Sequence, residues 1–501
     1  MILLTNIPIQ RAKLLPKLSL NFLLDKDVKL YASIGKMISE AYSTSEVAEM
    51  AGVHRDTLLR WLRQGLIQEP ARDRHGWRIF TEKHAREVVQ FANSSLPSGM
   101  VKESAPKYGR ASDFEELESI DWDFANAKTN YLTHGLHPYP AKFIPQIPNA
   151  LIQELSSVGE TVADIFCGSG TTLVEALTLK RNAIGVDANP LACLISAAKT
   201  TRFHENDAEI LSALANRAFQ LAGSVSLSVP NLFGTDGFLS TAFRPDHKAL
   251  SFWFDPFIVE ELAEILSWCR ALPTESARTV ALTAASSIIV SVSKQDSDTR
   301  YVRREKKLSV GDAFRRFAQA LSDAIRVVAE FTELVEPRFT CKIYHADVLA
   351  QPDIGSIDLV VCSPPYPNAY SYHLYHMTRM VWLGMDQQKF KREEIGSHRK
   401  YSNKGANGAT AKTFQHEMGV VFKWIHKHLK PGKFVCFVVG DSTVRGEKIS
   451  NADLISNVAT EHGLVELTRI SRRLQDTKKA FNPTIGKIKD EQILILRNIG
   501  E

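Results

Sequence analysis

One stretch, residues 161–172, decides the fold; it reads Thr161-Val162-Ala163-Asp164-Ile165-Phe166-Cys167-Gly168-Ser169-Gly170-Thr171-Thr172. It begins as an apolar run typical of a buried strand, passes two closely spaced glycines and continues into a helical pattern. Gly168 and Gly170 permit a tight turn and close backbone approach to a ligand. We expect Thr171 or Thr172 to cap the helix. A strand, a glycine turn and a helix in this order are typical of an α/β protein.

The next strand-like run, residues 183–187, ends in Asp187 and is followed by Asn189 and Pro190. An acid about 20 residues past a glycine turn is placed to accept hydrogen bonds from ribose hydroxyls. An ordinary α/β turn would explain the glycines alone. The glycines and the acid together predict a cofactor site.

A second motif, Ser363-Pro364-Pro365-Tyr366, follows the strand-like run 357–362. It therefore stands at the carboxyl end of a strand, where open α/β sheets bind ligands. Two successive prolines remove two backbone N–H groups and stiffen the chain. Carbonyl groups, a hydroxyl and an aromatic ring are left to converge on one point, an arrangement that suits a planar ring bearing an amino group.

These motifs resemble those of the DNA amino-methyltransferases, which modify exocyclic amines of DNA bases. Residues 363–366 resemble motif IV in the serine form most associated with N4-cytosine enzymes, and residues 161–172 resemble the S-adenosylmethionine loop, motif I. The resemblance implies a Rossmann-like, S-adenosylmethionine-dependent methyltransferase sheet over residues 129–499. It implies that the strand-like runs 464–468 and 492–496 close this sheet as an antiparallel hairpin.

Residues 134–145 resemble the family's motif X, and Asp347 matches the acid that contacts the adenine amino group of the cofactor. The resemblance assigns catalysis to Ser363, Pro364, Pro365 and Tyr366. It assigns cofactor binding to Tyr139, Ala141, Lys142, Asp164, Phe166, Gly168, Ser169, Gly170, Thr171, Thr172, Asp187, Asn189, Pro190 and Asp347.

The N-terminal part has its own pattern. Residues 42–62 read as a helix capped near Ser43 or Thr44, a turn at Gly52 and a second amphipathic helix, and the strand-like run 76–81 follows. This resembles the winged helix-turn-helix of MerR-type regulators, over residues 37–93. The resemblance implies a core of Val47, Ala48, Val53, Leu58 and Leu62. It implies DNA contacts from His54, Arg55 and Arg60. A protein-binding winged helix is the alternative.

We expect residues 1–36 to be an N-terminal extension ahead of an alternative start at Met37, and residues 94–128 to be a linker. Residues 202–337 form an insertion with helical stretches at 258–271, 277–292 and 311–335, far longer than a βα connection needs. Its basic segment predicts DNA contacts from Arg300, Arg303 and Arg304. The insertion is one candidate target-recognition region, although it precedes Asp347, a departure from the family layout. Residues 386–413 are the second candidate.

Composition agrees with this interpretation. The chain has 501 residues, 44% of them hydrophobic, and a mildly basic net charge of +5. The six cysteines form no C-x-x-C pair, so we expect reduced thiols and a cytoplasmic protein, with Cys167, Cys362 and Cys436 in or beside core strands. No cysteine is placed for methylation at cytosine carbon 5. We expect no membrane span and no metal site, and we expect His373 and His376 to line a DNA cleft rather than bind a metal.

The expected function is transfer of a methyl group from S-adenosylmethionine to an exocyclic amine of double-stranded DNA. Cytosine N4 is the first expectation and adenine N6 the second. The target base must be flipped out of the duplex. Ser363 and the Pro364 carbonyl would bind the amine, and Tyr366 would stack on the base. An RNA methyltransferase and a DNA-binding regulator with an inactive methyltransferase domain are the other classes. A cognate restriction endonuclease is a candidate partner.

Overall fold

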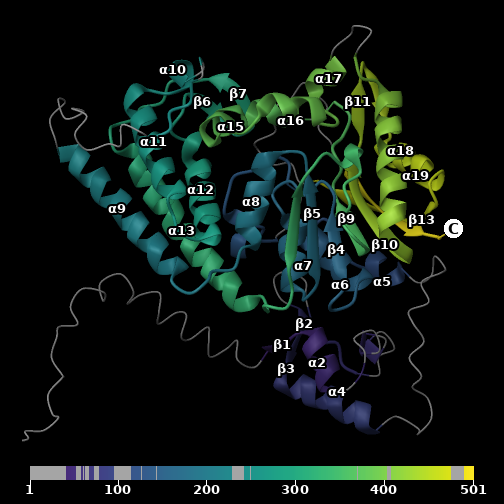
Figure 1. Cartoon of the computed structure of the whole chain (residues 1–501). Coiled ribbons are helices and arrows are strands. Elements are labelled where there is room, and N and C mark those ends of the chain that lie inside the picture. The colour runs from purple at the N-terminus through teal and green to yellow at the C-terminus, as the bar shows by residue number, and fades with distance from the viewer. Residues whose placement is uncertain are drawn as a thin grey trace, which may run out of the picture. The chain divides into compact units, whose positions relative to one another are not determined.

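A computed structural model gives the fold, and it places the chain in two compact units, Met1–Lys107 and Tyr108–Glu501 (Figure 1). The structure describes residues 41–51, 53, 58–59, 61–62, 67–72, 78–94, 114–125, 127–142, 144–227, 242–246, 248, 250–368, 370–402, 408–474 and 490–500. The N-terminal extension 1–36 and the predicted DNA-contacting residues His54, Arg55 and Arg60 lie outside the described residues.

The N-terminal unit contains a small antiparallel sheet of order β1-β3-β2. Its elements are β1 Ala41–Tyr42, α2 Thr44–Met50, β2 Ala71–Arg72, β3 Arg78–Thr81 and α4 Glu82–Ser94. Ser43 caps α2, because its Oγ accepts the Glu46 N–H at 3.3 Å while its own N–H donates to Glu46 Oε2 at 2.7 Å. The predicted core is confirmed: Val47, Ala48, Leu58 and Leu62 are buried, and Val53 packs against them.

The second unit is built on a seven-stranded sheet of order β13-β14-β10-β9-β4-β5-β8. Its strands are β4 Thr161–Asp164, β5 Asn182–Asp187, β8 Cys341–His345, β9 Ile357–Cys362, β10 Leu429–Gly440, β13 Leu464–Arg473 and β14 Asp490–Asn498. All pairings are parallel except those of β14, which is antiparallel to both β10 and β13. The predicted α/β class, with a largely parallel sheet closed by an antiparallel pair of strands, is confirmed.

Helices cover both faces of this sheet (Figure 1). The covering helices are α6 Gln146–Leu155, α7 Thr171–Thr178, α8 Pro190–Thr200, α18 Ala411–His428 and α19 Asn451–Thr460. Successive strand residues point to opposite cores: Leu359 packs with α6 and α7, and Val360 packs with α18 and α19. A strand buried on both faces reads as a continuous apolar run, as residues 357–362 do. The predicted burial of Cys167, Cys362 and Cys436 is confirmed.

The insertion forms a helical layer with its own core. Its elements are α9 Asp207–Leu227, α10 Leu250–Trp253, α11 Pro256–Arg270, α12 Glu275–Ile289, the hairpin β6 Gln295–Ser297 and β7 Arg300–Arg303, and α13 Asp312–Leu334. Buried Glu261 of α11 accepts the N–H groups of Gly311 and Ala313 at 2.6 and 2.9 Å, and so caps α13. Because α12 packs against α8, the layer is fixed to the sheet beside the first helices after β4 and β5.

The linker prediction is wrong over residues 114–125. Phe114, Leu117 and Trp122 are buried with the sheet, and Leu117 belongs to the short helix α5 Glu115–Glu118. Arg472 Nε donates to the Trp122 carbonyl at 3.0 Å, which ties this segment to β13. The apolar residues were spaced too irregularly to predict an element, but the closing hairpin provides the surface that buries them.

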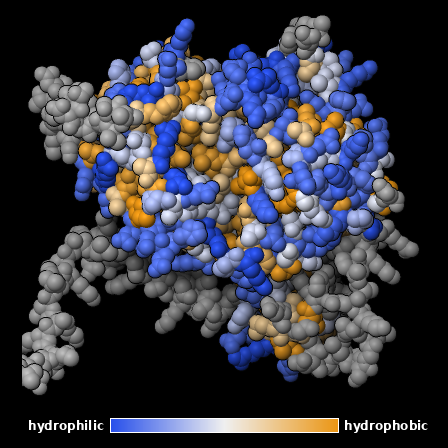
Figure 2. Space-filling view, viewed as in Figure 1, coloured by the Kyte–Doolittle hydropathy of each residue, from blue (hydrophilic) through white to orange (hydrophobic). Residues whose placement is uncertain are grey.

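A string of short helices follows β9 and runs above the sheet toward α18 (Figure 1). They are α14 Tyr372–Tyr375, α15 Met377–Leu383, α16 Gln387–Glu393 and α17 His398–Ser402. Figure 2 shows hydrophilic side chains gathered over α16. Within the described residues, none of the helices is long and apolar enough to span a membrane.

Candidate active site

The glycine turn after β4 has the conformation that its sequence predicts. Gly168 and Gly170 have φ angles of 48° and 75°, the left-handed region that glycine adopts without strain. A Cβ atom at Gly170 would lie 2.8 Å from Ser196 Oγ of α8, and the Ser196 hydroxyl donates to the Gly168 carbonyl at 2.8 Å. The turn, which leads directly into α7, is thus packed against α8.

The predicted threonine cap is wrong. Gly170 itself is the N-cap of α7, and no side chain caps it. Thr172 Oγ1 instead donates to the Val361 carbonyl of β9 at 3.2 Å, so this threonine joins the turn to the neighbouring strand. The left-handed conformation that the tight turn demands leaves no room for a β-region cap residue at this position.

Asp187 ends β5 beside this turn. Its Oδ2 accepts the Gly168 N–H and its Oδ1 accepts the Asn189 N–H, both at 2.8 Å. Burial raises the pKa of this carboxyl to about 6, despite the two N–H donors that lower it. The side chain stays partly exposed, so oxygen lone pairs remain for a ligand. Asp347 follows the adjacent strand β8, and its Oδ1 accepts the Leu349 N–H at 2.9 Å.

Asn189 joins three segments that are distant in sequence. Its Oδ1 caps α8 by accepting the Leu191 N–H at 3.0 Å. Its Nδ2 lies 3.4 Å from the Tyr139 hydroxyl and 3.2 Å from His376 Nδ1. Tyr139 stacks on Tyr372 with ring centroids 5.8 Å apart. The segment resembling motif X and the helix after Ser363–Tyr366 therefore meet at the end of β5.

The remaining predicted cofactor residues differ in accessibility. Asp164 is buried beneath the turn, where burial raises its pKa to about 7, and its Oδ1 accepts the Phe166 N–H at 3.2 Å. Ser169 Oγ is buried and has no hydrogen-bond partner among the described residues. Lys142 Nζ donates to the His134 carbonyl at 3.0 Å. The partly or fully exposed members of the predicted set are Tyr139, Ala141, Lys142, Phe166, Gly168, Asp187, Pro190 and Asp347.

The Ser-Pro-Pro-Tyr segment leaves the carboxyl end of β9 as predicted. Ser363 Oγ donates to the Val438 carbonyl of β10 at 3.0 Å, and the Tyr366 hydroxyl donates to the same carbonyl at 3.2 Å. The two hydroxyl oxygens are 3.4 Å apart. Both side chains are partly exposed, whereas Pro364 is buried. One strand carbonyl therefore orients the serine and the tyrosine together.

The segment from α16 to α17 lies against this motif. A Cβ atom at Gly396 would overlap the Tyr366 carbonyl oxygen and lie 3.3 Å from Pro365 Cβ. Buried Glu394 accepts the Tyr372 N–H at 2.6 Å, and its Oε2 lies 2.5 Å from His373 Nδ1. Residues 386–402 thus contact both the Ser-Pro-Pro-Tyr motif and α14, and we call them the strap.

The prediction that His373 and His376 line a DNA cleft is wrong. Their exposed fractions are 2% and 0%. His373 is bound to Glu394 of the strap, and His376 faces Asn189 and Tyr139. A spacing of three placed them on one helical turn, but the strap and α8 cover that turn.

The predicted DNA-contacting arginines of the insertion lie on the β6–β7 hairpin, which we call the ribbon. Arg300 and Arg304 each pair with Asp296, at 3.5 and 3.3 Å, and Arg303 pairs with Glu305 at 2.5 Å. All three side chains are exposed, by 58%, 74% and 39%.

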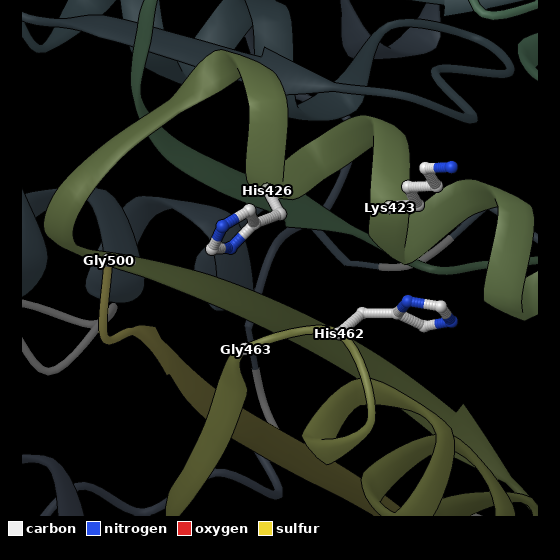
Figure 3. Close-up of a pocket in the computed structure, with 5 residues that line it drawn as sticks. All are labelled: Lys423, His426, His462, Gly463 and Gly500. Carbon is white, nitrogen blue, oxygen red and sulfur yellow. The ribbon is translucent and has the colours of Figure 1, made fainter.

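Sequence reasoning missed Tyr372, Glu394 and Gly396. Each reaches the site through a contact distant in sequence, so no local pattern marked it. A cavity of about 380 Å³ lies elsewhere, lined by Lys423, His426, His462, Gly463 and Gly500 (Figure 3). Gly463 precedes the first residue of β13, and Gly500 follows the last residues of β14. At this end of the hairpin, Asn498 Nδ2 donates to the carbonyl of Leu429, the first residue of β10. The cavity therefore lies at the amino ends of β9 and β10, and Ser363 lies at the opposite, carboxyl end of β9.

Two family models match parts of the chain that carry the resemblances. Residues 64–198 match the family model described as DNA methylase, which takes in the glycine turn and Asp187 and ends before Ser363. Residues 43–80 match the family model described as MerR family regulatory protein.

Several similar proteins are Type II methyltransferases. M.MjaII of Methanocaldococcus jannaschii is 31% identical over 153 residues, which are 25% of this chain and 29% of that protein. M.MvaI of Kocuria varians is 29% identical over 173 residues, 34% of this chain and 36% of that protein. The chain thus matches about a third of each relative. Among solved structures, the rRNA methyltransferase aviRa of Streptomyces viridochromogenes is 12% identical with a TM-score of 0.28, over 73% of this chain and 89% of that one.

Proposed function

We propose that the protein is an S-adenosylmethionine-dependent methyltransferase that acts on an exocyclic base amine of double-stranded DNA. One observation carries the proposal: the glycine turn, Asp187 and the Ser-Pro-Pro-Tyr motif converge at one edge of a single sheet. The names of the similar Type II methyltransferases support the same reaction. They also suggest a cognate restriction endonuclease as a partner.

The residues at the turn fit the cofactor. A Cβ atom would lie 2.8 Å from Ser196 Oγ at Gly170 and 3.4 Å from the Tyr139 ring at Gly168, so glycine allows the turn to pack closely, and Ser169 Oγ is a buried hydroxyl without a partner among the described residues. Asp187 would accept the ribose hydroxyls, because two backbone N–H groups already orient its carboxylate. Asp347 and Tyr139 would border the adenine and the methionine ends. When bound, S-adenosylmethionine supplies an electrophilic methyl group on a sulfonium centre.

The chain's own residues would prepare the amine. Because Ser363 Oγ gives its only proton to the Val438 carbonyl, its lone pairs remain to accept an N–H from the base. The Pro364 carbonyl would accept the second amine proton. These two hydrogen bonds would draw the nitrogen toward tetrahedral geometry and free its lone pair for attack. The nitrogen–carbon bond would form as the methyl–sulfur bond breaks, which would leave a neutral thioether, and the surplus proton on the nitrogen would pass to solvent.

The base must leave the duplex to reach this site, since its amine is otherwise paired and stacked. Tyr366 would hold the flipped base by stacking, with its hydroxyl fixed on Val438. No covalent nucleophile is needed, because positioning two reactants supplies a large part of the acceleration. The serine in the motif favours cytosine N4 over adenine N6.

Mass spectrometry of nucleosides tests the proposal. Plasmid DNA from a host that lacks its own methylases is incubated with the protein and S-adenosylmethionine, then digested. We expect N4-methylcytosine. N6-methyladenine in its place would keep the reaction and correct the base, while unmodified nucleosides would contradict the proposal. An RNA substrate in parallel tests the alternative polymer.

A further inference from the structure

The ribbon is fastened to the helices that follow the Ser-Pro-Pro-Tyr motif, beside α15 in Figure 1. Gln295, at its first position, is fully buried. Its Nε2 donates to the Tyr375 carbonyl of α14 at 3.2 Å, and its Oε1 accepts the Thr378 hydroxyl of α15 at 3.0 Å. The amide group thus bonds to both helices at once.

A second contact holds the tip of the ribbon. Arg379 of α15 has an exposed fraction of 0%, and its Nη2 lies 2.5 Å from Asp298 Oδ1, which follows β6. Its Nε donates to the Ser286 carbonyl of α12 at 2.9 Å. A buried guanidinium without a counter-charge is strongly unfavourable, so Asp298 is held where it can neutralise Arg379.

The same arginine stands close to the cofactor side of the site. Arg379 is one helical turn from His376, whose Nδ1 lies 3.2 Å from Asn189 Nδ2, and Asn189 N–H donates to Asp187. His137, in the segment resembling motif X, lies 3.0 Å from Ser286 Oγ through its Nε2. The ribbon, α15 and the cofactor turn therefore share one buried polar cluster.

The outer side of the ribbon differs from its anchored side. Arg300 and Arg304 are exposed and paired only with Asp296 of the same ribbon among the contacts described, and Val302 is 53% exposed. Two-stranded ribbons fit the major groove of DNA. Exposed arginines beside an exposed apolar residue suit contact with a duplex.

From these contacts we infer that Arg379 is a positioning residue: through Asp298 it holds the ribbon in register with the Ser-Pro-Pro-Tyr segment. DNA contact by the ribbon then places the target base over Ser363. The inference rests on the proposed function, because it assigns the ribbon a duplex as its partner. Arg379 itself touches neither DNA nor cofactor.

Asp298→Asn and Asp296→Asn make a matched pair for the test. Both remove one negative charge from the same ribbon, but only Asp298 faces Arg379. We expect neither variant to bind a pool of random-sequence DNA duplexes more weakly than the parent, and Asp296→Asn, which releases Arg300 and Arg304, to bind more tightly, so kcat is compared at saturating DNA. We expect Asp298→Asn to lower kcat for methyl transfer about tenfold or more, since small misplacements of a substrate are costly. Asp296→Asn should keep the parental kcat. Equal kcat values for the two variants would overturn the inference.

A double-mutant cycle gives the second test. In an Arg379→Met background, which keeps a long buried side chain, Asp298→Asn should cause no further loss of kcat, because its partner is already absent. Additive losses would contradict the assignment. Thermal unfolding of each variant identifies any that fail to fold.

Hydrogen exchange separates this inference from the proposed function. Amides of residues 295–303 should exchange faster in Asp298→Asn than in Asp296→Asn, whatever the protein acts on. Equal exchange would contradict the anchoring. Absence of methyl transfer by the parent protein would contradict only the proposed function, since the exchange comparison still decides whether Asp298 anchors the ribbon.

Discussion

Substitution of Gly396 by alanine should separate catalysis from folding. Gly396 has a φ angle of 74°, and a Cβ atom there would overlap the Tyr366 carbonyl oxygen and lie 3.1 Å from the carbonyl carbon. A left-handed alanine costs about 1–2 kcal/mol. Relief of the overlap needs a displacement of about 1 Å, since non-bonded heavy atoms settle near 3.5 Å. Because Tyr366 and Ser363 are joined through Val438, that displacement reaches the proposed catalytic serine.

A displacement of about 1 Å at a reacting centre costs about a hundredfold in rate, so we expect kcat to fall by about that factor. Gly384→Ala is the matched control: its φ is 70°, and a Cβ atom there would meet nothing within 4 Å. It carries the same backbone cost without the overlap. Methyl transfer from labelled cofactor gives kcat, calorimetry gives cofactor affinity and thermal unfolding gives stability. Equal kcat values in Gly396→Ala and Gly384→Ala would refute the idea that the strap positions this motif.

Three further outcomes are expected. Ser363→Ala should lower turnover sharply with little change in DNA affinity, while Tyr366→Phe should retain much of the activity and Tyr366→Ala should also weaken capture of a fluorescent target base. Burial raises the pKa of Asp187 from 3.8 to about 6, so the folded state binds this proton more tightly than the unfolded state does. The contribution of Asp187 to stability should therefore fall as pH rises through that window. Cofactor affinity should rise over the same window, because the ionised carboxylate is the acceptor for the ribose hydroxyls. Unfolding and calorimetry of parent and Asp187→Asn across the window check both signs. Deletion of residues 1–93 should weaken duplex binding and flatten its salt dependence, and unchanged binding would favour a protein-binding role for that unit.

Local sequence patterns predicted the positions of strand ends well. The runs 161–164, 182–187 and 357–362 are apolar because strands of a parallel sheet are buried on both faces. The carboxyl ends of parallel strands lie at the same end of a sheet. The sequence alone therefore predicted that the glycine turn, Asp187 and Ser363 lie close together. The helices of the insertion were also evident from sequence, while the closing hairpin was predicted from the family resemblance.

Contacts between distant segments could not be predicted in this way. Asn189 meets His376 across 187 positions, and Tyr139 stacks on Tyr372. The burial of His373 and the overlap at Gly396 depend on where the strap lies. A threonine near the start of a helix often caps it. Here the left-handed Gly170 occupies the N-cap position of α7, so neither Thr171 nor Thr172 caps the helix.

The charges near the site suggest a division of work in binding DNA. Residues 294–305 contain four Lys or Arg against three acids, and the ribbon arginines are already paired. The ribbon therefore adds little net positive charge to attract phosphates. Its arginines can still contact DNA, because an exposed ion pair is worth only about 0–1 kcal/mol and is easily replaced by a contact to the duplex. The strap, residues 386–402, contains five Lys or Arg against three acids, a larger positive excess, so it carries more of the attraction. Salt dependence of duplex affinity should thus respond more to neutralising Lys391 and Arg392 of α16 than Arg300 and Arg304, because counterion release follows the number of phosphates neutralised. Discrimination between DNA sequences should respond in the opposite order, since contacts to base edges, and not those to phosphates, carry it.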